Sequence, residues 1–148
     1  GITSIKIPDS VTSIGDNAFY SCDKLTEVII PDSVTRIRQE AFEACYNLTE
    51  VTFGSGLTTI DANVFADCRA LKTVNFTGNN LKTIGTDVFF GTAIERLVLP
   101  DSVETLGSMG YLRQLTYIDL GNVKDFKQVD ARFLSDEEKA QLLQIHKI

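Results

Sequence analysis

The chain has 148 residues, 43% of them hydrophobic and 23% charged, with a formal net charge of −6. The length suits one domain, and the absence of basic residues interleaved with aromatics argues against nucleic acid as a partner. No apolar run approaches the roughly 18 residues of a membrane-spanning helix, and the N-terminus lacks the basic and apolar regions of a signal peptide.

The chain repeats itself with a period of 23 residues. The same type of residue recurs in several columns: Ile2, Leu25, Leu48, Leu71 and Ile94; Ile5, Val28, Val51, Val74 and Leu97; Cys22, Cys45 and Cys68. Self-similarity at this period is typical of a solenoid, in which each repeat buries its apolar face against its neighbours. The pattern is already under way at Ile2, so we expect further sequence upstream.

Each repeat predicts three short segments, which are clearest in residues 25–47. Residues 27–30 alternate with a period of two, as in a strand, and Pro31 begins a turn because it removes a ladder donor. Residues 34–37 can form a second extended segment. Residues 39–45 place Ala41, Phe42 and Cys45 at helical spacing and predict one or two helical turns.

The later copies depart from this unit. The third replaces the proline turn by Gly54-Ser55-Gly56, and the fourth gains a residue at 77–80 but loses one at 91–93. The fifth is only 21 residues long, with Gly107-Ser108-Met109-Gly110 where the helical turn should be. We therefore predict a solenoid over residues 1–134, with about six coils that start near residues 2, 25, 48, 71, 94 and 115.

The tail is predicted to be a capping helix over residues 135–148. Ser135 and Glu138 form a capping box, and Leu142, Leu143 and Ile145 give the segment one apolar stripe. Terminal repeats of solenoids are commonly atypical because they cover the core.

The pattern Leu-x-x-Val-x-Ile-Pro-x-x-Val-x-x-Ile, followed by Ala-Phe-x-x-Cys-x-x-Leu, resembles the BspA-type leucine-rich repeat over residues 2 to about 120. The resemblance implies a right-handed α/β repeat solenoid with short parallel strands on one face and short helices or turns opposite. It also implies a bacterial secreted or cell-surface protein that adheres to other molecules.

Two ladders of side chains are expected to point inward. Parallel coils about 4.8 Å apart stack the three cysteines in a column, which does not converge on one point as a zinc site requires. Buried, reduced thiols are therefore favoured over a metal or redox site. The other ladder is aromatic and consists of Phe19, Phe42, Phe65 and Phe89. Asp9, Asp32 and Asp101 follow prolines and favour turn formation over a calcium column.

No catalytic constellation is apparent, so the sequence predicts no enzyme and no cofactor. His146 is the single histidine and has no motif around it. Glu27 and Glu50 lie one coil apart, near the separation of a retaining glycosidase pair, but like charges on a solvated face explain them more simply.

The outward strand positions vary between copies while the inward columns barely change, so they form the predicted binding face. Besides Ser4, they are Lys6, Glu27, Ile29, Glu50, Thr52, Thr73, Asn75, Arg96, Val98, Tyr117 and Asp119. The favoured function is a non-catalytic adhesion module that binds a host or microbial protein or glycan. The alternatives are a solvated sheet face, a purely structural spacer, or a repeat segment that self-associates through an uncapped N-terminal coil.

Overall fold

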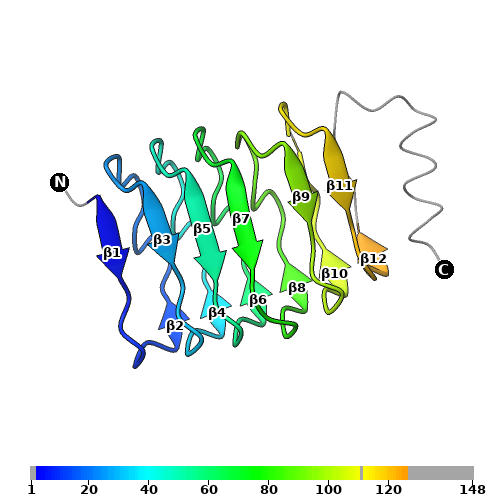
Figure 1. Cartoon of the computed structure of the whole chain (residues 1–148), viewed down its shortest axis with the longest axis horizontal. Coiled ribbons are helices and arrows are strands. Elements are labelled where there is room, and N and C mark those ends of the chain that lie inside the picture. Colours follow the sequence, from blue (N-terminus) through cyan, green and yellow to red (C-terminus); the bar gives the residue numbers. More distant parts are fainter. Residues whose placement is uncertain (1–2, 111, 127–148) are drawn as a thin grey trace.

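The computed structural model describes residues 3–110 and 112–126, which form two columns of short parallel strands along the molecule (Figure 1). The first column, here called the strand face, consists of β1 (Ser4–Lys6), β3 (Glu27–Ile29), β5 (Glu50–Phe53), β7 (Thr73–Phe76), β9 (Arg96–Val98) and β11 (Tyr117–Asp119). The second column consists of β2 (Ser13–Ile14), β4 (Arg36–Ile37), β6 (Thr59–Ile60), β8 (Thr83–Ile84), β10 (Thr105–Leu106) and β12 (Asp125–Phe126).

Strand pairing follows the repeat, and the predicted parallel solenoid is confirmed. Ser4 is in register with Glu27, and Glu27 with Glu50, so residues 23 positions apart stack in columns. The second column is one continuous six-stranded sheet, in the order β12-β10-β8-β6-β4-β2. The strand face is instead divided into a four-stranded sheet, β1-β3-β5-β7, and a two-stranded sheet, β11-β9.

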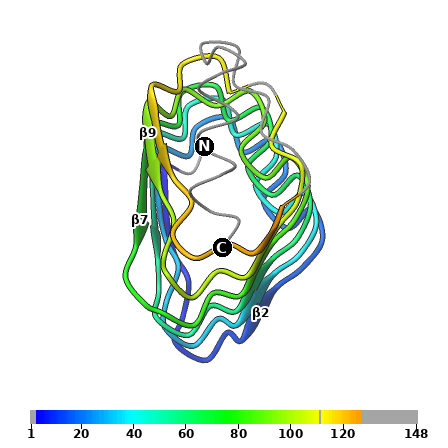
Figure 2. The same cartoon turned by 90° about the vertical axis from the view of Figure 1, so that its right-hand side faces the viewer.

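The core lies between the two columns of strands, as the view along the solenoid axis shows (Figure 2). Leu25, Leu48 and Leu71 are fully buried in one inward column. The predicted phenylalanine ladder is also confirmed, with ring centroids 5.0, 5.4 and 6.0 Å apart from Phe19 through Phe89. Identical positions therefore pack on one another from coil to coil, which is how the core of a solenoid is stabilised.

The proline segments form the turns that the sequence predicts. Val34 N donates to Pro31 O at 3.1 Å, which closes a four-residue turn after β3. The Asp32 side chain does not bond to its own turn, however. Its Oδ1 accepts from Ser55 N in the next coil at 2.7 Å, so the aspartate ties neighbouring turns together.

The predicted helical turns opposite the strand face are wrong, because no helix occurs in residues 3–110 and 112–126. Two tight turns replace them, and each contains a residue in the left-handed region. The two columns of positive φ are Asn17, Glu40, Asn63 and Asp87, and Ser21, Ala44, Asp67 and Gly91. A left-handed residue ends any helical run, and backbone bonds between coils, such as Phe42 N to Val64 O at 2.9 Å, take the place of bonds within a helix.

The fifth and sixth coils keep the solenoid pattern. The sixth coil retains its second strand, since β12 pairs with β10. In the shortened fifth coil, Met109 is buried and Ser108 O accepts from Asp87 N. The predicted capping helix, residues 135–148, lies outside the described residues. Within the described part, no helix is long and apolar enough to cross a membrane.

Candidate functional site

The strand face presents the predicted binding residues in two side-by-side columns. Each of them is exposed or half-buried, while their neighbours on the same strands point into the core. The first column holds Ser4, Glu27, Glu50 and Thr73, with Arg96 and Tyr117 beyond the break. The second holds Lys6, Ile29, Thr52 and Asn75, with Val98 and Asp119 beyond it.

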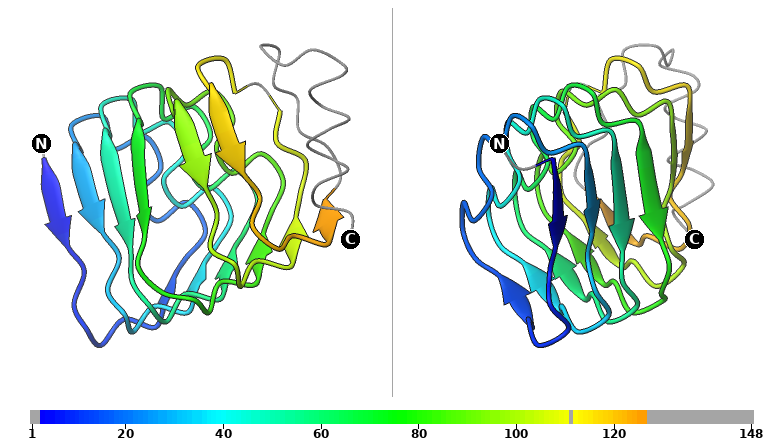
Figure 3. Two further views of the ribbon diagram at one scale, coloured as in Figure 1. Left: turned by 45° about the vertical axis from the view of Figure 1, so that its right-hand side comes forward. Right: turned by 60° about the vertical axis from the view of Figure 1, so that its left-hand side comes forward.

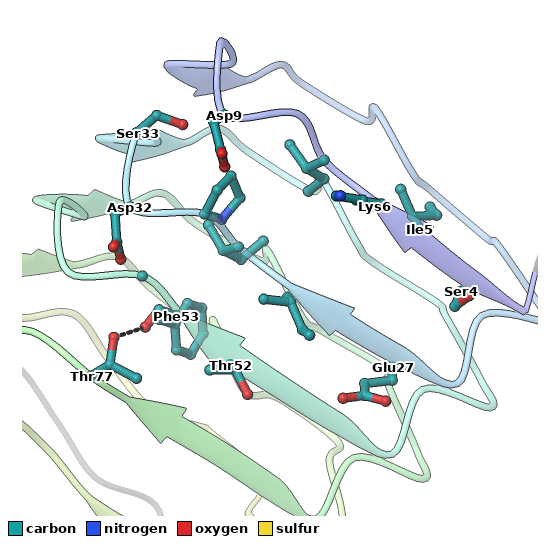
Figure 4. A pocket seen from close by; sticks show the side chains of 15 residues that line it. Ser4, Ile5, Lys6, Asp9, Glu27, Asp32, Ser33, Thr52, Phe53 and Thr77 are labelled. Atoms are coloured by element: carbon teal, nitrogen blue, oxygen red, sulfur yellow. Dashed lines mark hydrogen bonds between the residues drawn. The ribbon is translucent and has the colours of Figure 1, made fainter.

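A groove of about 840 Å³ lies over the carboxyl ends of β1, β3 and β5 (Figure 4). Ile29 lies within it and is 57% exposed, a large apolar surface to leave in water. Lys6 and Glu27 line the strand side of the groove, and Asp9 and Asp32 line the turn side. The groove therefore combines an apolar surface with a surplus of carboxylates.

The turn residues of this groove were not among the predicted binding residues. Asp9 and Asp32 were interpreted only as turn formers. The signal that could have found them is the position of the proline turn directly after each strand, because parallel coils bring successive turns to the same edge of a sheet.

The middle of the face is tied together by polar side chains. Asn75 Nδ2 donates to Glu50 Oε1 at 3.0 Å and lies 3.3 Å from Thr52 Oγ1. Glu27 and Glu50 are register partners on β3 and β5, so the structure brings the candidate carboxylate pair together. Glu50 already accepts a bond from Asn75, as expected of a hydrogen-bonded surface carboxylate.

The far end of the face carries an arginine stacked on an aromatic ring. Arg96 Cζ lies 3.9 Å from the centroid of the Tyr117 ring, within the range of a cation–π contact. Val98 and Tyr117 are 44% and 43% exposed. No described carboxylate forms an ion pair with Arg96, since the salt bridges within residues 3–110 and 112–126 join Arg36 to Asp61 and Lys82 to Glu104.

A second hollow, of about 470 Å³, lies where the strand face is divided. It is lined from β7 by Val74, Asn75 and Phe76 and from β9 by Arg96 and Val98, with the turn residues Gly78, Asn79, Leu99 and Pro100 at one end. Volumes of this size are typical of sites for small ligands or short peptide segments.

The cysteine column lies inside the solenoid, as expected. Cys45 and Cys68 are fully buried free thiols, and Cys22 is half-buried in the first coil. The Cys45 thiol donates to Phe19 O at 3.2 Å and the Cys68 thiol to Phe42 O at 3.1 Å. Hydrogen bonding to Cys45 and burial raise the pKa of Cys68 well above its ordinary value, and burial raises the pKa of Cys22.

The hydrogen bond with Cys68 lowers the pKa of Cys45 instead. The raised pKa values of Cys22 and Cys68 keep these two thiols protonated at neutral pH, and the buried cysteines act as small core residues. Among residues 3–110 and 112–126, no group of three or more histidine, cysteine or acidic side chains is arranged to hold a metal ion. His146 lies outside the described residues.

The fold is shared with solved bacterial leucine-rich repeat proteins. One from T. pallidum is 24% identical, with a TM-score of 0.76, and the match covers 97% of this chain and 83% of that one. One from Bacteroides ovatus is 30% identical, with a TM-score of 0.74, over 80% of this chain and 34% of that one. The chain thus spans about a third of the B. ovatus structure.

A leucine-rich cell surface protein from Faecalibacterium prausnitzii is 29% identical, with a TM-score of 0.57, over 84% of this chain and 39% of that one. No curated protein sequence matches the chain. The profile of the BspA type leucine rich repeat region matches residues 1–116 in six copies. The chain therefore belongs to the BspA-type leucine-rich repeat family.

Proposed function

We propose that this chain is a non-catalytic interaction module of a bacterial secreted or cell-surface protein, and that its strand face binds a host or microbial protein or glycan. The observation that carries the proposal is the groove around Ile29, whose apolar side chain is 57% exposed among Lys6, Glu27 and two turn aspartates. Large apolar side chains in a hollow rimmed by charges are typical of interaction sites.

The surface location is proposed from relatives. The F. prausnitzii protein, at 29% identity, is a cell surface protein. Free, buried thiols and the regular ladder of short strands are compatible with any compartment, so the location depends on that likeness.

The binding surface can be tested on arrays of extracellular proteins and of glycans, followed by surface plasmon resonance on each hit. The variants Ile29→Lys and Tyr117→Ala each replace one exposed side chain, the first in the groove near the N-terminal end of the strand face and the second at its far end. Tyr46→Ala is the matched control. Tyr46 lies in the turn that precedes β5, is 42% exposed and stacks under Arg69, as Tyr117 stacks under Arg96.

We expect a ligand whose affinity falls at least tenfold in Ile29→Lys or Tyr117→Ala and stays unchanged in Tyr46→Ala. Wild-type affinity in both strand-face variants would place the binding surface elsewhere and contradict the proposal.

The alternative is a structural role, as a spacer or a self-associating repeat. It is favoured by the edges of β7 and β9 that face each other across the break in the strand face, where neither strand is paired. A sheet edge left open in this way is a template for another chain. Sedimentation velocity over a range of concentrations separates the two functions, since a strict monomer contradicts self-association.

A further inference from the structure

The strand face contains a gap between β7 and β9 that is wide enough to matter for binding. These consecutive strands are not hydrogen-bonded to each other, while every other consecutive pair in either column is. Nearly all Cα pairs between β7 and β9 lie more than 8 Å apart, whereas paired strands lie about 4.8 Å apart. In the left panel of Figure 3, this gap is the widest along the face.

The gap exposes residues that are core residues everywhere else in the middle of the array. Val74 and Phe76 point inward but are only half-buried, while their equivalents Val51, Leu97 and Phe53 are at most 1% exposed. These half-buried side chains line the hollow of about 470 Å³ described above. Apolar core surface is therefore accessible here, between two middle coils of the described part of the chain.

The gap has a cause in the sequence. At the start of each strand, one residue donates its N–H to the equivalent residue of the preceding coil: Thr26 to Thr3, Thr49 to Thr26, Lys72 to Thr49 and Thr116 to Glu95. No such bond joins Glu95 to Lys72, both of them described residues. Ala93 N donates to Leu71 O instead, because the turn before β9 is one residue shorter than in the earlier coils.

We propose that this cleft holds a short extended segment of a protein ligand, with an acidic side chain of that segment on Arg96. The proposal rests on the proposed function and names the ligand chemistry of one part of the strand face. Two features of the cleft favour an extended peptide over a sugar.

The first feature is the unpaired backbone on both sides of the cleft. β7 and β9 present strand edges to each other that no strand fills, and main-chain groups of an added strand are the natural partners of an open edge. One strand placed between two others needs a spacing of about 10 Å, twice the normal ~4.8 Å, and the gap already provides most of it.

The second feature is the positive charge of Arg96. Among the described residues, Arg96 is the single charged one that lines the cleft, and it has no ion-pair partner among the described carboxylates. Its guanidinium is held against Tyr117, so little side-chain freedom is lost when a carboxylate binds. Val98 and Phe76 beside it favour an apolar residue next to the acidic one.

The ends of the cleft limit what can enter. The bond from Ala93 N to Leu71 O, at 2.9 Å, closes one end, and the bond from Ser102 N to Asn79 Oδ1, at 3.1 Å, closes the other. The ligand segment therefore dips into the cleft for a few residues and continues over the strand face on either side.

The test is a displayed library of random linear peptides, selected on the whole chain, with the enriched peptides resynthesised. We expect enrichment of an acidic residue beside a β-branched or aromatic one. Hydrogen exchange of the complex should show new protection in β7 and β9. Affinity should fall about tenfold in Arg96→Ala, partly recover in Arg96→Lys, and stay unchanged in the control Arg69→Ala.

Three results of the peptide experiments would overturn the proposal: no enriched peptide, enriched peptides that bind Arg96→Ala as tightly as the wild type, or protection confined to β1, β3 and β5. The last result, or a strand-face ligand found on the protein and glycan arrays, would leave the proposed function standing. A glycan that carries a carboxylate and needs Arg96 would overturn the peptide as occupant.

Discussion

Arg96 and Tyr117 are register partners on β9 and β11, and the guanidinium carbon lies 3.9 Å from the centre of the tyrosine ring. The pairing is set by the parallel ladder, which places equivalent positions of consecutive coils side by side. It joins the two residues that make the far end of the strand face most suited to binding, because arginine and tyrosine are enriched among residues that dominate interface energetics.

This pair should be energetically coupled. A double-mutant cycle with Arg96→Ala and Tyr117→Ala, measured by urea unfolding, is expected to give a coupling of about 0.5–1 kcal/mol, typical of an exposed cation–π contact. The pair Arg69 and Tyr46, with 5.1 Å between guanidinium carbon and ring centre, is the control and should show a smaller coupling. A value of zero for the first pair would mean that the stacking has no energetic content.

The phenylalanine ladder should be the most sensitive part of the core. Phe42 is fully buried and stacks on Phe19 and Phe65, so Phe42→Ala leaves a cavity that the neighbouring coils cannot fill. We expect the free energy of unfolding to fall by about 3–5 kcal/mol. Tyr20→Ala, on a side chain that is 51% exposed, should cost about 1 kcal/mol or less. A similar small loss for Phe42→Ala would contradict its core role.

The left-handed turn positions offer a stabilising substitution. Glu40 has φ of 60°, and the equivalent positions in the first and third coils hold Asn17 and Asn63. Because asparagine tolerates this conformation better than other L-residues, Glu40→Asn should raise the free energy of unfolding by about 0.5–1 kcal/mol.

The control for this substitution is Glu40→Gln. It removes the same negative charge but gives no preference for the left-handed region. That charge matters to its neighbour, since burial and then the Glu40 carboxylate raise the pKa of Glu43. If both variants gain equally, the cause is electrostatic and the backbone argument is wrong.

Stability should depend on alkaline pH through the buried Cys68 thiol. Hydrogen bonding to Cys45 and burial raise the pKa of Cys68 well above the ordinary 9.0, so the unfolded chain loses this proton at a lower pH than the folded chain. The free energy of unfolding should therefore fall as pH rises above about 9. Urea unfolding of wild type and Cys68→Ala in reductant tests this, and an equally steep fall in both would assign the loss to other groups.

The periodicity of the sequence was sufficient to predict the columns but not every local conformation. Residues such as Val28 and Ile30 recur at fixed spacing, and a parallel ladder is the simplest way to stack them. The spacing of Ala41, Phe42 and Cys45 is the same in a helix and in two successive tight turns. Ala44 has a φ of 61°, but alanine is not a residue type that predicts a left-handed turn, so the helical prediction failed there.

The binding face was predictable in outline, because outward strand positions follow from alternation. The groove was less so, since Asp9 and Asp32 reach it through turns whose positions depend on how the coils stack. The gap between β7 and β9 was the hardest feature to predict from the sequence. Its signal is the missing residue before β9, which acquires meaning only once the bonds between coils are known.

The gap itself should be visible in the free protein by amide hydrogen exchange. β5 is paired on both sides, whereas β7 is paired with β5 alone and β9 with β11 alone. Amides that point into the gap lack a ladder acceptor, so alternate amides of β7 and β9 should exchange faster than those of β5, although all three strands lie inside the array. Uniform slow exchange across β5, β7 and β9 would mean that the sheet is closed in solution. β8 and β10 are the internal control, because the same two coils remain paired there, so fast exchange in those strands would indicate a general loosening of the fourth and fifth coils, not a local opening of the strand face.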